Sequence, residues 1–235
     1  MDVLGIKVDN FSKDEVLEKI GGFLKDGNFH QIATVNPEFI LQAQEDETFK
    51  NILNSCDLNI PDGIGLSMAF WKKGTSIKSR IPGADLFEGL LGLANNAGLG
   101  VFLAANKDGL SSWEETRDII LKKYTNLKIR GVNLDRNNIN YQPQVDDCSL
   151  VFCNFGAPYQ EKFLHSLKSR ENGKIKIAMG VGGSFDFLTG KLKRAPVFMH
   201  FLGLEWLFRL IQQPKRIKRI WKAVIIFPVK VIWRG

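Results

Sequence analysis

Four segments of the sequence place glycines and polar residues directly after a short apolar run. They read ATVNPE at 33–38, PDGIG at 61–65, FGAPYQE at 155–161 and GVGGSFD at 180–186. Glycine lets a backbone approach a ligand closely, and the first turn of a helix offers free N–H groups to a phosphate. If these segments meet at one edge of a sheet, they form a pocket for a phosphorylated ligand.

Several motifs are absent, and their absence narrows the reaction. The sequence has no GxxxxGK[ST] loop, no GxGxxG spacing in its glycine-rich segment, no GxSxG elbow and no DxD pair. It therefore lacks the signatures of Walker-type nucleotide hydrolases, dinucleotide-binding proteins and serine hydrolases, and the usual carboxylate pair for a metal-bound sugar nucleotide. An enzyme that handles phosphate without a metal must neutralise the leaving group with arginine, lysine or helix N-termini. Arg80, shortly before a predicted helix, and the basic end of the chain are candidates for that role.

The elements that would position these segments alternate along most of the chain. Short apolar runs predict strands at 3–8, 31–35, 58–60, 100–104, 127–132, 150–154 and 175–179. Capping residues and helical spacing predict helices at 12–24, 36–44, 85–96, 111–124 and 159–169. This alternation indicates a Rossmann-like α/β domain, with a largely parallel sheet covered by helices on both faces. It stops within residues 190–196, so we predict an α/β catalytic domain over 1–194 and a helical C-terminal appendage over 195–235.

The net charge of +7 is concentrated at the end of the chain. Residues 201–235 contain eight basic residues and one acidic residue, so of the 32 basic and 25 acidic residues in all, 24 of each remain in residues 1–200. Because the body is formally neutral, the composition does not fit a uniformly basic nucleic-acid-binding protein. The alternative that stays open is a binding module whose tail grips nucleic acid through the five basic residues and Trp221 within 215–222.

Features that report on the cellular compartment are consistent with one another. The N-terminus has neither the basic leader nor the apolar core of a secretory signal, and no segment reaches the ~18 apolar residues of a membrane-spanning helix. The three cysteines, Cys56, Cys148 and Cys153, include no CxxC pair, which indicates buried free thiols in a reducing compartment. We therefore expect a cytoplasmic protein that is soluble or peripheral to a membrane.

From residue 217 the appendage has the pattern of an amphipathic helix. Its apolar residues follow helical spacing at Ile217, Ile220, Trp221, Val224, Ile225 and Pro228. Lysines and arginines occupy the neighbouring faces, a combination typical of a helix that lies in the interface of an anionic membrane. The alternative is a terminal helix packed on the domain with a solvated basic face, and both hold if the segment changes partner. Apolar residues exposed there also favour self-association into a homo-oligomer in the absence of a membrane.

Six motifs occur in an order that resembles a known family. They are TVNPE at 34–38, PDGIG at 61–65, RxPGxD at 80–85, FGxPxQEK at 155–162, VGGSFD at 181–186 and GLEWLFR at 203–209. From about residue 4 to residue 219 the sequence resembles the WecG/TagA/CpsF glycosyltransferases. The resemblance implies an inverting, metal-independent enzyme without a cofactor. Such an enzyme moves a sugar from a UDP-sugar donor to a polyprenyl-pyrophosphate-linked acceptor at the cytoplasmic face of the membrane.

The resemblance also narrows the donor sugar. The teichoic-acid members transfer N-acetylmannosamine to lipid-linked N-acetylglucosamine, and the motifs here are most similar to theirs. N-acetylmannosamine is therefore the first expectation. Glucose and N-acetylmannosaminuronic acid, which relatives in the family use, are the alternatives.

Residues of the body take roles from this resemblance. Asp62 matches the proposed base, which removes the proton of the acceptor hydroxyl in a single displacement; its alternative is a turn residue bonded to its own backbone. Thr34 and Asn36 match residues at the donor sugar, and their alternative role is helix capping. Arg80 matches a residue proposed to hold the donor phosphate, against a surface arginine. Gln160 matches another pocket residue, against an exposed residue in the first turn of a helix.

Further positions shape or complete the predicted pocket. The glycine-rich segment contributes Gly182, Gly183 and Asp186, without individual roles. In the family, arginines of the appendage are thought to fold over the active site and contact the donor pyrophosphate; the matching positions are Arg209, Arg216 and Arg219. Pro214 breaks the helix between the first two of these arginines and is expected to act as a hinge. A scaffold that has kept the fold and lost catalysis is a further interpretation, and the intact site residues argue against it.

Overall fold

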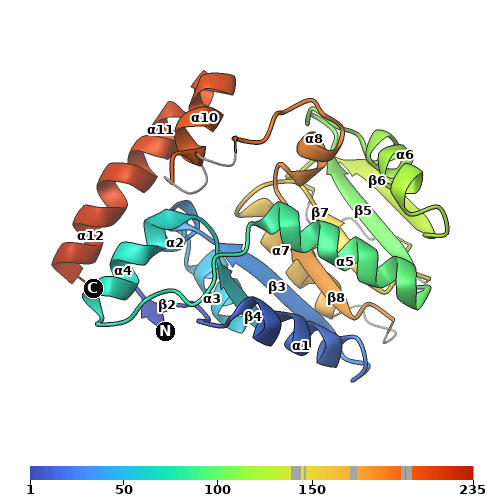
Figure 1. The fold of residues 1–235 in the computed structure, drawn as a ribbon, viewed down its shortest axis with the longest axis horizontal. Helices are drawn as coiled ribbons and strands as arrows, with labels where there is room; N and C mark the ends of the chain where they lie inside the picture. The colour runs from blue at the N-terminus through green and yellow to red at the C-terminus, as the bar shows by residue number, and fades with distance from the viewer. Residues whose placement is uncertain (139–143, 146, 170–173, 197–198, 200–202, 235) are drawn as a thin grey trace.

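Six parallel strands form the central sheet of the computed structural model, in the order β4-β3-β8-β7-β5-β6 (Figure 1). The structure describes residues 1–138, 144–145, 147–169, 174–196, 199 and 203–234. The strands of the sheet are β3 (His30–Val35), β4 (Leu58–Pro61), β5 (Val101–Asn106), β6 (Ile129–Leu134), β7 (Leu150–Cys153) and β8 (Ile177–Gly180). Every neighbouring pair is parallel, which confirms the predicted α/β class.

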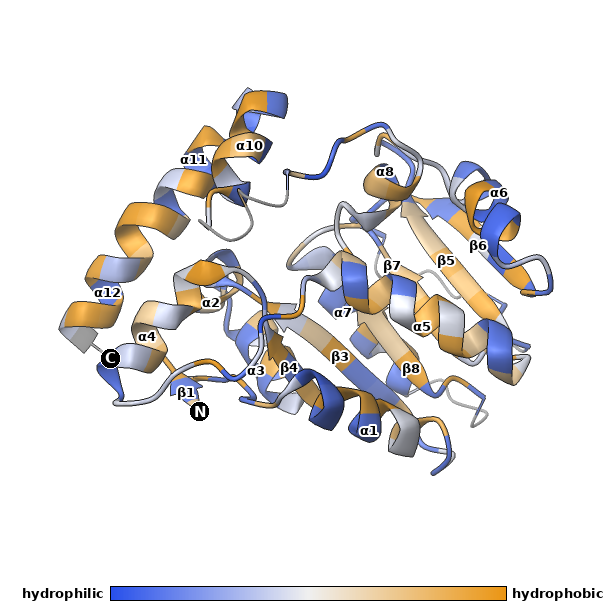
Figure 2. Ribbon diagram, viewed as in Figure 1, coloured by the Kyte–Doolittle hydropathy of each residue, from blue (hydrophilic) through white to orange (hydrophobic). Residues whose placement is uncertain are grey.

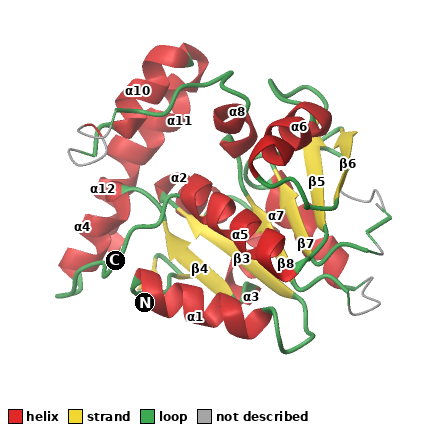
Figure 3. Cartoon of the chain, turned by 45° about the vertical axis from the view of Figure 1, so that its right-hand side comes forward, coloured by secondary structure: helices red, strands yellow, loops and turns green. Residues whose placement is uncertain are grey.

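Helices cover both faces of this sheet (Figures 1 and 3). One face carries α1 (Lys13–Phe23), α5 (Gly83–Ala97), α6 (Trp113–Lys123) and the short α8 (Ser184–Leu188). The other carries α2 (Pro37–Ala43), α3 (Glu47–Ser55) and α7 (Tyr159–Lys168), with α4 (Ser67–Lys72) beside α2. Because successive strand residues point to opposite faces, Ile32 joins the first core and Ala33 the second. Strands buried on both sides read as continuous apolar runs, which explains why they were recognisable in the sequence.

Local signals set most of the helix boundaries. Ser12 and Ser112 each form a complete capping box. The serine hydroxyl accepts a hydrogen bond from the backbone N–H of the glutamate three residues later, and the carboxylate of that glutamate accepts one from the backbone N–H of the serine. Asn36 caps α2 and Gly98, at φ 64°, ends α5. The three cysteines are buried thiols outside any disulfide, as predicted.

The strand predicted at 3–8 is wrong. This segment forms a separate antiparallel hairpin of β1 (Asp2–Val3) and β2 (Ile6–Lys7) and does not join the parallel sheet. Leu4 and Gly5 both have positive φ, 52° and 81°, as a two-residue hairpin turn requires. Val3 and Ile6 are nonetheless buried, against the core beneath α2 and α3. The apolar pattern of this segment therefore predicts its burial correctly and its strand pairing incorrectly.

The C-terminal segment is helical and lies along α2 and α4 (Figure 1). It comprises α10 (Glu205–Gln212), η2 (Pro214–Arg216), α11 (Ile217–Trp221), the π-helical turn η3 (Lys222–Ile226) and α12 (Phe227–Arg234). Pro214 follows the end of α10, which confirms the predicted break. The π-turn ends just before Pro228, which lacks an N–H and would clash with the carbonyl four residues earlier in a regular helix. The boundary at residue 194 stays a prediction.

Candidate active site

The four segments singled out in the sequence meet at one edge of the sheet. They follow β3, β4, β7 and β8, and these strands are consecutive neighbours in the order β4-β3-β8-β7. Because all four strands are parallel, their carboxyl ends point the same way (Figure 1). The predicted convergence is confirmed, at the edge of an open α/β sheet where ligands bind.

Asp62 lies at the end of β4 and is half-buried. Its backbone N–H donates to the carbonyl of Val35 at 2.8 Å, which fixes it beside the end of β3. Burial raises the pKa of its carboxyl to about 7, with further contributions from the negative charges of Glu205 and Asp85 and an opposing one from Arg209. A carboxyl that loses its proton near neutral pH is suited to accept one from a hydroxyl group.

Two of these neighbours were not identified as site residues in the sequence. Glu205 begins α10 of the appendage, and Asp85 lies in the first turn of α5, where its Oδ1 accepts from Arg194 Nη2 at 2.6 Å. Both belong to motifs that the sequence contained, RxPGxD and GLEWLFR. Motif spacing could not reveal that they act on Asp62, because only the fold brings their charges near it.

Thr34 and Asn36 lie at the end of β3. Thr34 is buried, and a Cβ placed on Gly83, the first residue of α5, would lie 3.1 Å from its Oγ1. Asn36 is half-buried, and its Oδ1 accepts from the backbone N–H of Phe39 at 3.2 Å. The capping role of Asn36 is therefore present, while a donor-sugar role for either residue stays a prediction.

The two neighbouring loops pack closely at Gly65 of the PDGIG segment. A Cβ at this position would lie 2.4 Å from Pro37 Cγ, and the proline ring is rigid. We expect Gly65→Ala to lower the free energy of unfolding by about 1–3 kcal/mol, the usual cost of overpacking. Denaturant unfolding measures this. Gly89→Ala, within α5 where a Cβ meets nothing within 4 Å, is the matched control and should stabilise slightly. Equal stability of the two variants would contradict this packing.

Gln160 is buried, which rules out the alternative of an exposed first-turn residue, while its role as a pocket residue stays a prediction. Its Oε1 accepts from the backbone N–H of Gly156 at 3.0 Å and of Gly182 at 3.1 Å. Gln160 therefore joins the loop after β7 to the loop after β8.

Arg209 extends from α10 to the glycine-rich loop. Its guanidinium lies 4.9 Å from the ring centroid of Phe187, and its Nη2 is 3.9 Å from where a Cβ of Gly183 would lie. The Nε is buried and, among the described residues, has no hydrogen-bond partner. A cation therefore lies at the carboxyl edge of the sheet with a donor still to be satisfied.

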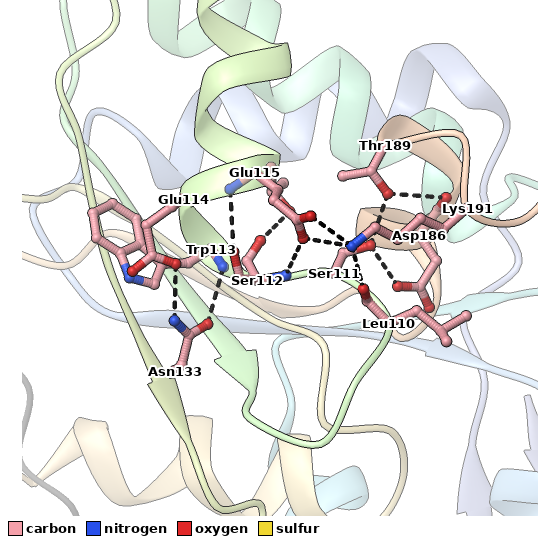
Figure 4. Close-up of polar contacts among 11 residues, drawn as sticks. Leu110, Ser111, Ser112, Trp113, Glu114, Glu115, Asn133, Asp186, Thr189 and Lys191 are labelled. Atoms are coloured by element: carbon pink, nitrogen blue, oxygen red, sulfur yellow. Dashed lines mark hydrogen bonds and ion pairs between the residues drawn. The ribbon is translucent and has the colours of Figure 1, made fainter.

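Asp186 is held by a polar network around the start of α6 (Figure 4). Its Oδ1 accepts from Ser111 Oγ at 2.8 Å, and Ser111 Oγ also lies 2.7 Å from Thr189 Oγ1. Lys191 Nζ donates to both carboxylate oxygens of Glu115, at 2.7 and 2.6 Å. Burial raises the pKa of Asp186, and the Ser111 hydrogen bond opposes the increase. The network ties the loop after β5 to α8.

The other two appendage arginines lie near Arg209. Burial, and then the charges of Arg209 and Arg219, lower the pKa of Arg216 to about 10, so the side chain remains protonated at neutral pH. Arg219 donates through Nε and Nη2 to Glu38 Oε2, at 2.9 and 2.5 Å, beside the start of α2. Because Arg219 is paired with Glu38, the cations left to favour an anionic ligand are Arg209 and Arg216. Arg80, by contrast, is exposed and has no hydrogen-bond or ion-pair partner within the described part of the chain.

The whole sequence, residues 1–235, matches the glycosyl transferase WecG/TagA/CpsF family. The chain belongs to this family. Among its relatives is the N-acetylglucosaminyldiphosphoundecaprenol N-acetyl-beta-D-mannosaminyltransferase of Bacillus subtilis (strain 168), 36% identical over 94% of this chain and 82% of the relative. A protein of the same name from Bacillus spizizenii is 34% identical over 84% of this chain and 75% of its own length.

The candidate site of this WecG/TagA/CpsF family member brings together the Asp62 carboxyl, whose pKa is about 7, and a set of cations at one edge of the sheet. Asp62 can exchange a proton with a hydroxyl, and Arg209 and Arg216 can stabilise negative charge on a leaving phosphate. Across the described ranges, no His, Cys, Asp and Glu side chains are grouped in a way that could hold a metal ion.

Proposed function

We propose that this protein transfers N-acetylmannosamine from UDP-N-acetylmannosamine to undecaprenyl-diphosphate-linked N-acetylglucosamine, with inversion and without a metal. The names of the relatives support this acceptor and this sugar. The observation that carries the proposal is the position of Asp62 at the carboxyl edge of the sheet, where its carboxyl has a pKa of about 7 and is influenced by the charge of Arg209. Residues 1–194 form the catalytic domain, and residues 195–235 form the appendage that completes the site.

The proposed reaction is a single displacement. The Asp62 carboxylate accepts the proton of the acceptor hydroxyl while that oxygen bonds to the anomeric carbon of the donor. The bond from this carbon to the UDP oxygen breaks, and its electron pair leaves with the diphosphate. Arg209, Arg216 and Arg219 stabilise the charge that develops there, which is the role a metal ion takes in other transferases.

An assay with purified protein tests the reaction. UDP-N-acetylmannosamine and the lipid-linked acceptor are supplied with and without EDTA, beside UDP-glucose and UDP-N-acetylmannosaminuronic acid as competing donors. The proposal expects N-acetylmannosamine transfer that chelation leaves unchanged. Loss of activity with EDTA would overturn the metal-free mechanism, and turnover of another donor alone would change the sugar.

The C-terminal helices support a peripheral position on the inner face of the cell membrane. No helix among the described residues has both the length and the apolar composition needed to cross a bilayer. One side of the α11–α12 helix is packed on the body through Ile220, Phe227 and Val231, all buried. Figure 2 shows that much of this C-terminal segment is hydrophobic. Seven of its apolar residues are exposed: Ile217, Trp221, Val224, Ile225, Val229, Ile232 and Trp233. The packed side fits the terminal-helix alternative, and the exposed apolar side supports the proposed contact with a membrane surface.

Vesicle binding tests this surface. Replacing Trp221, Ile225 and Ile232 together by serine should weaken binding to phosphatidylglycerol-containing vesicles at least about tenfold, since each such side chain withdrawn from water contributes roughly 1.5–3 kcal/mol. Leu17→Ser, at an exposed position on α1, is the control and should bind like the unmodified protein. Unchanged vesicle binding by the triple variant, or salt-dependent binding to nucleic acid in place of vesicles, would contradict the membrane assignment.

A further inference from the structure

Gln160 and Glu161 form a buried pair in the first turn of α7. Their side chains are 3% and 1% exposed, and Gln160 Nε2 donates to Glu161 Oε1 at 2.7 Å. The pair fills the space beside Gly180 at the end of β8. A Cβ on Gly180 would lie 2.3 Å from Gln160 Nε2 and 2.7 Å from Glu161 Oε1, so only glycine leaves room for the pair.

The pair holds two loops that the sequence does not connect. Gln160 Oε1 accepts from Gly156 in the loop after β7 and from Gly182 in the loop after β8. Both glycines have positive φ, 75° and 49°, a conformation that costs other residues free energy. The Gln160 amide oxygen thus holds both loops through the N–H groups of Gly156 and Gly182, which take no part in the hydrogen bonds of the sheet.

Glu161 determines which end of the Gln160 amide faces these loops. An unprotonated carboxyl oxygen only accepts, so Glu161 Oε1 draws Nε2 toward itself and leaves Oε1 for the two N–H groups. The backbone of Glu161 is held in turn, because its carbonyl accepts from Gln31 Nε2, on β3, at 3.1 Å. The second carboxyl oxygen, Oε2, is buried and has no hydrogen-bond partner among the described residues. Burial raises the pKa of Glu161 to about 7, against the Gln160 hydrogen bond. Burial disfavours the charged form of a carboxyl, so packing alone does not explain why a glutamate occupies position 161.

The loop after β8 carries the contact with the appendage. Gly183 follows Gly182 directly, and a Cβ placed on Gly183 would lie 3.9 Å from Arg209 Nη2. The conformation of this loop at Gly182 therefore affects the position of the Arg209 guanidinium.

We propose that Glu161 is a positioning residue for donor binding, acting through the Gln160 amide on the two glycine loops at the pyrophosphate. This inference rests on the proposed function, since it assumes that a UDP-sugar occupies this edge. Glu161 touches no substrate. Its effect is to hold the loops in one conformation before the donor arrives, which reduces the ordering that binding would otherwise require.

Two variants and one control test the role. Glu161→Leu removes the acceptor, Glu161→Gln restores a carbonyl oxygen of the same reach, and Phe163→Leu perturbs the core beneath the same helix without touching the pair. Calorimetry measures UDP binding, and steady-state kinetics separate the donor KM from kcat. Glu161→Leu should raise Kd and KM about tenfold with kcat changed less than about twofold, the effect of losing one buried hydrogen-bond partner. Glu161→Gln should lie within about threefold of the unmodified protein.

A merely structural role gives a different pattern. Fewer folded molecules would lower the apparent kcat and leave KM and Kd unchanged, as we expect for Phe163→Leu; the same result for Glu161→Leu would overturn the proposal. So would Glu161→Gln failing as completely as Glu161→Leu. If Glu161→Leu does not fold, Glu161→Asp withdraws the acceptor by one methylene and is held to the same expectation.

Amide hydrogen exchange separates this inference from the proposed function. The N–H groups of Gly156 and Gly182 should exchange at least about tenfold faster in Glu161→Leu than in the unmodified protein, and not in Phe163→Leu. Unchanged exchange at both glycines would overturn the positioning role even in an active enzyme. If the unmodified protein binds no UDP, the proposed function fails, and faster exchange would still support the action of Glu161 on the loops.

Discussion

Asp62→Asn is expected to lower kcat by a factor of about 10²–10⁴, the usual contribution of a positioned general base. Asparagine keeps the size and the backbone contact of the residue with Val35, while its amide cannot accept the proton of the acceptor hydroxyl. UDP binding should change little, because the base acts on the acceptor. Steady-state transfer kinetics, with UDP affinity from calorimetry, measure both effects.

The pKa of Asp62 gives this prediction a pH dependence. The carboxyl must be ionised to act as a base, so kcat/KM should rise with pH up to about 7 and then level off. The folded carboxyl keeps its proton to about pH 7, whereas the ordinary value is 3.8, so between these values the folded state binds more protons than the unfolded state. Stability therefore falls as pH rises through this window. Asp62→Asn lacks this loss and should melt at a higher temperature than the unmodified protein at pH 8, with the difference shrinking below pH 4.

The combination of lost activity and gained stability distinguishes a base from a turn residue. If Asp62 only closed the turn after β4, Asp62→Asn would retain near-full activity. Full activity of the variant, or a rate that falls as pH rises toward 7, would contradict its role as the base.

Arg209→Met is expected to lower kcat by about 10²–10³, because one preorganised cation at a developing negative charge contributes this much. Methionine retains contact with the Phe187 ring but removes the guanidinium beside Gly183. The kcat of Arg209→Lys should lie between that of Arg209→Met and that of the unmodified protein, because an ammonium keeps the charge without the planar set of donors. Loss of Arg209 should also raise the pH at which the rate levels off, because its charge lowers the pKa of Asp62, whereas removal of Glu205 should lower that pH.

A second arginine controls for general charge loss. Arg117, on α6, is paired with Asp118 and lies over the Trp113 ring, and Arg117→Met should leave kcat within about twofold of the unmodified protein. Equal losses in the two variants would show that net charge, and not the position of Arg209, governs the rate. A loss below about threefold in Arg209→Met would contradict its place at the leaving group.

Local features of the fold could be predicted from the sequence because they depend on nearby residues. The capping boxes at Ser12 and Ser112 and the break at Pro214 each involve contacts within a few positions. The hairpin at β1 and β2 could not, since two-residue strands carry too little pattern to show what they pair with. The strand order was equally inaccessible, and it is the order that places the four loops side by side.

Within the site, the motifs identified residues adjacent to strand ends, and the resemblance added the arginines of the appendage. The burial of Gln160 was missed because its partners, Gly156 and Gly182, belong to two separate loops. The influence of Glu205 on Asp62 was missed because the appendage must fold back to produce it. In the tail, helical spacing placed Ile220 and Trp221 on one apolar stripe, but packing buries the first and leaves the second 58% exposed.

The central claim, transfer of N-acetylmannosamine with Asp62 as the base, is tested most directly by one side-by-side measurement. Unmodified protein and Asp62→Asn are each given UDP-N-acetylmannosamine and undecaprenyl-diphosphate-linked N-acetylglucosamine in EDTA, and the released UDP and the disaccharide lipid are measured. We predict equal amounts of UDP and of an inverted disaccharide product from the unmodified protein, and at most about 1% of that rate from the variant. No product from the unmodified protein, or an equal rate from Asp62→Asn, would contradict the claim.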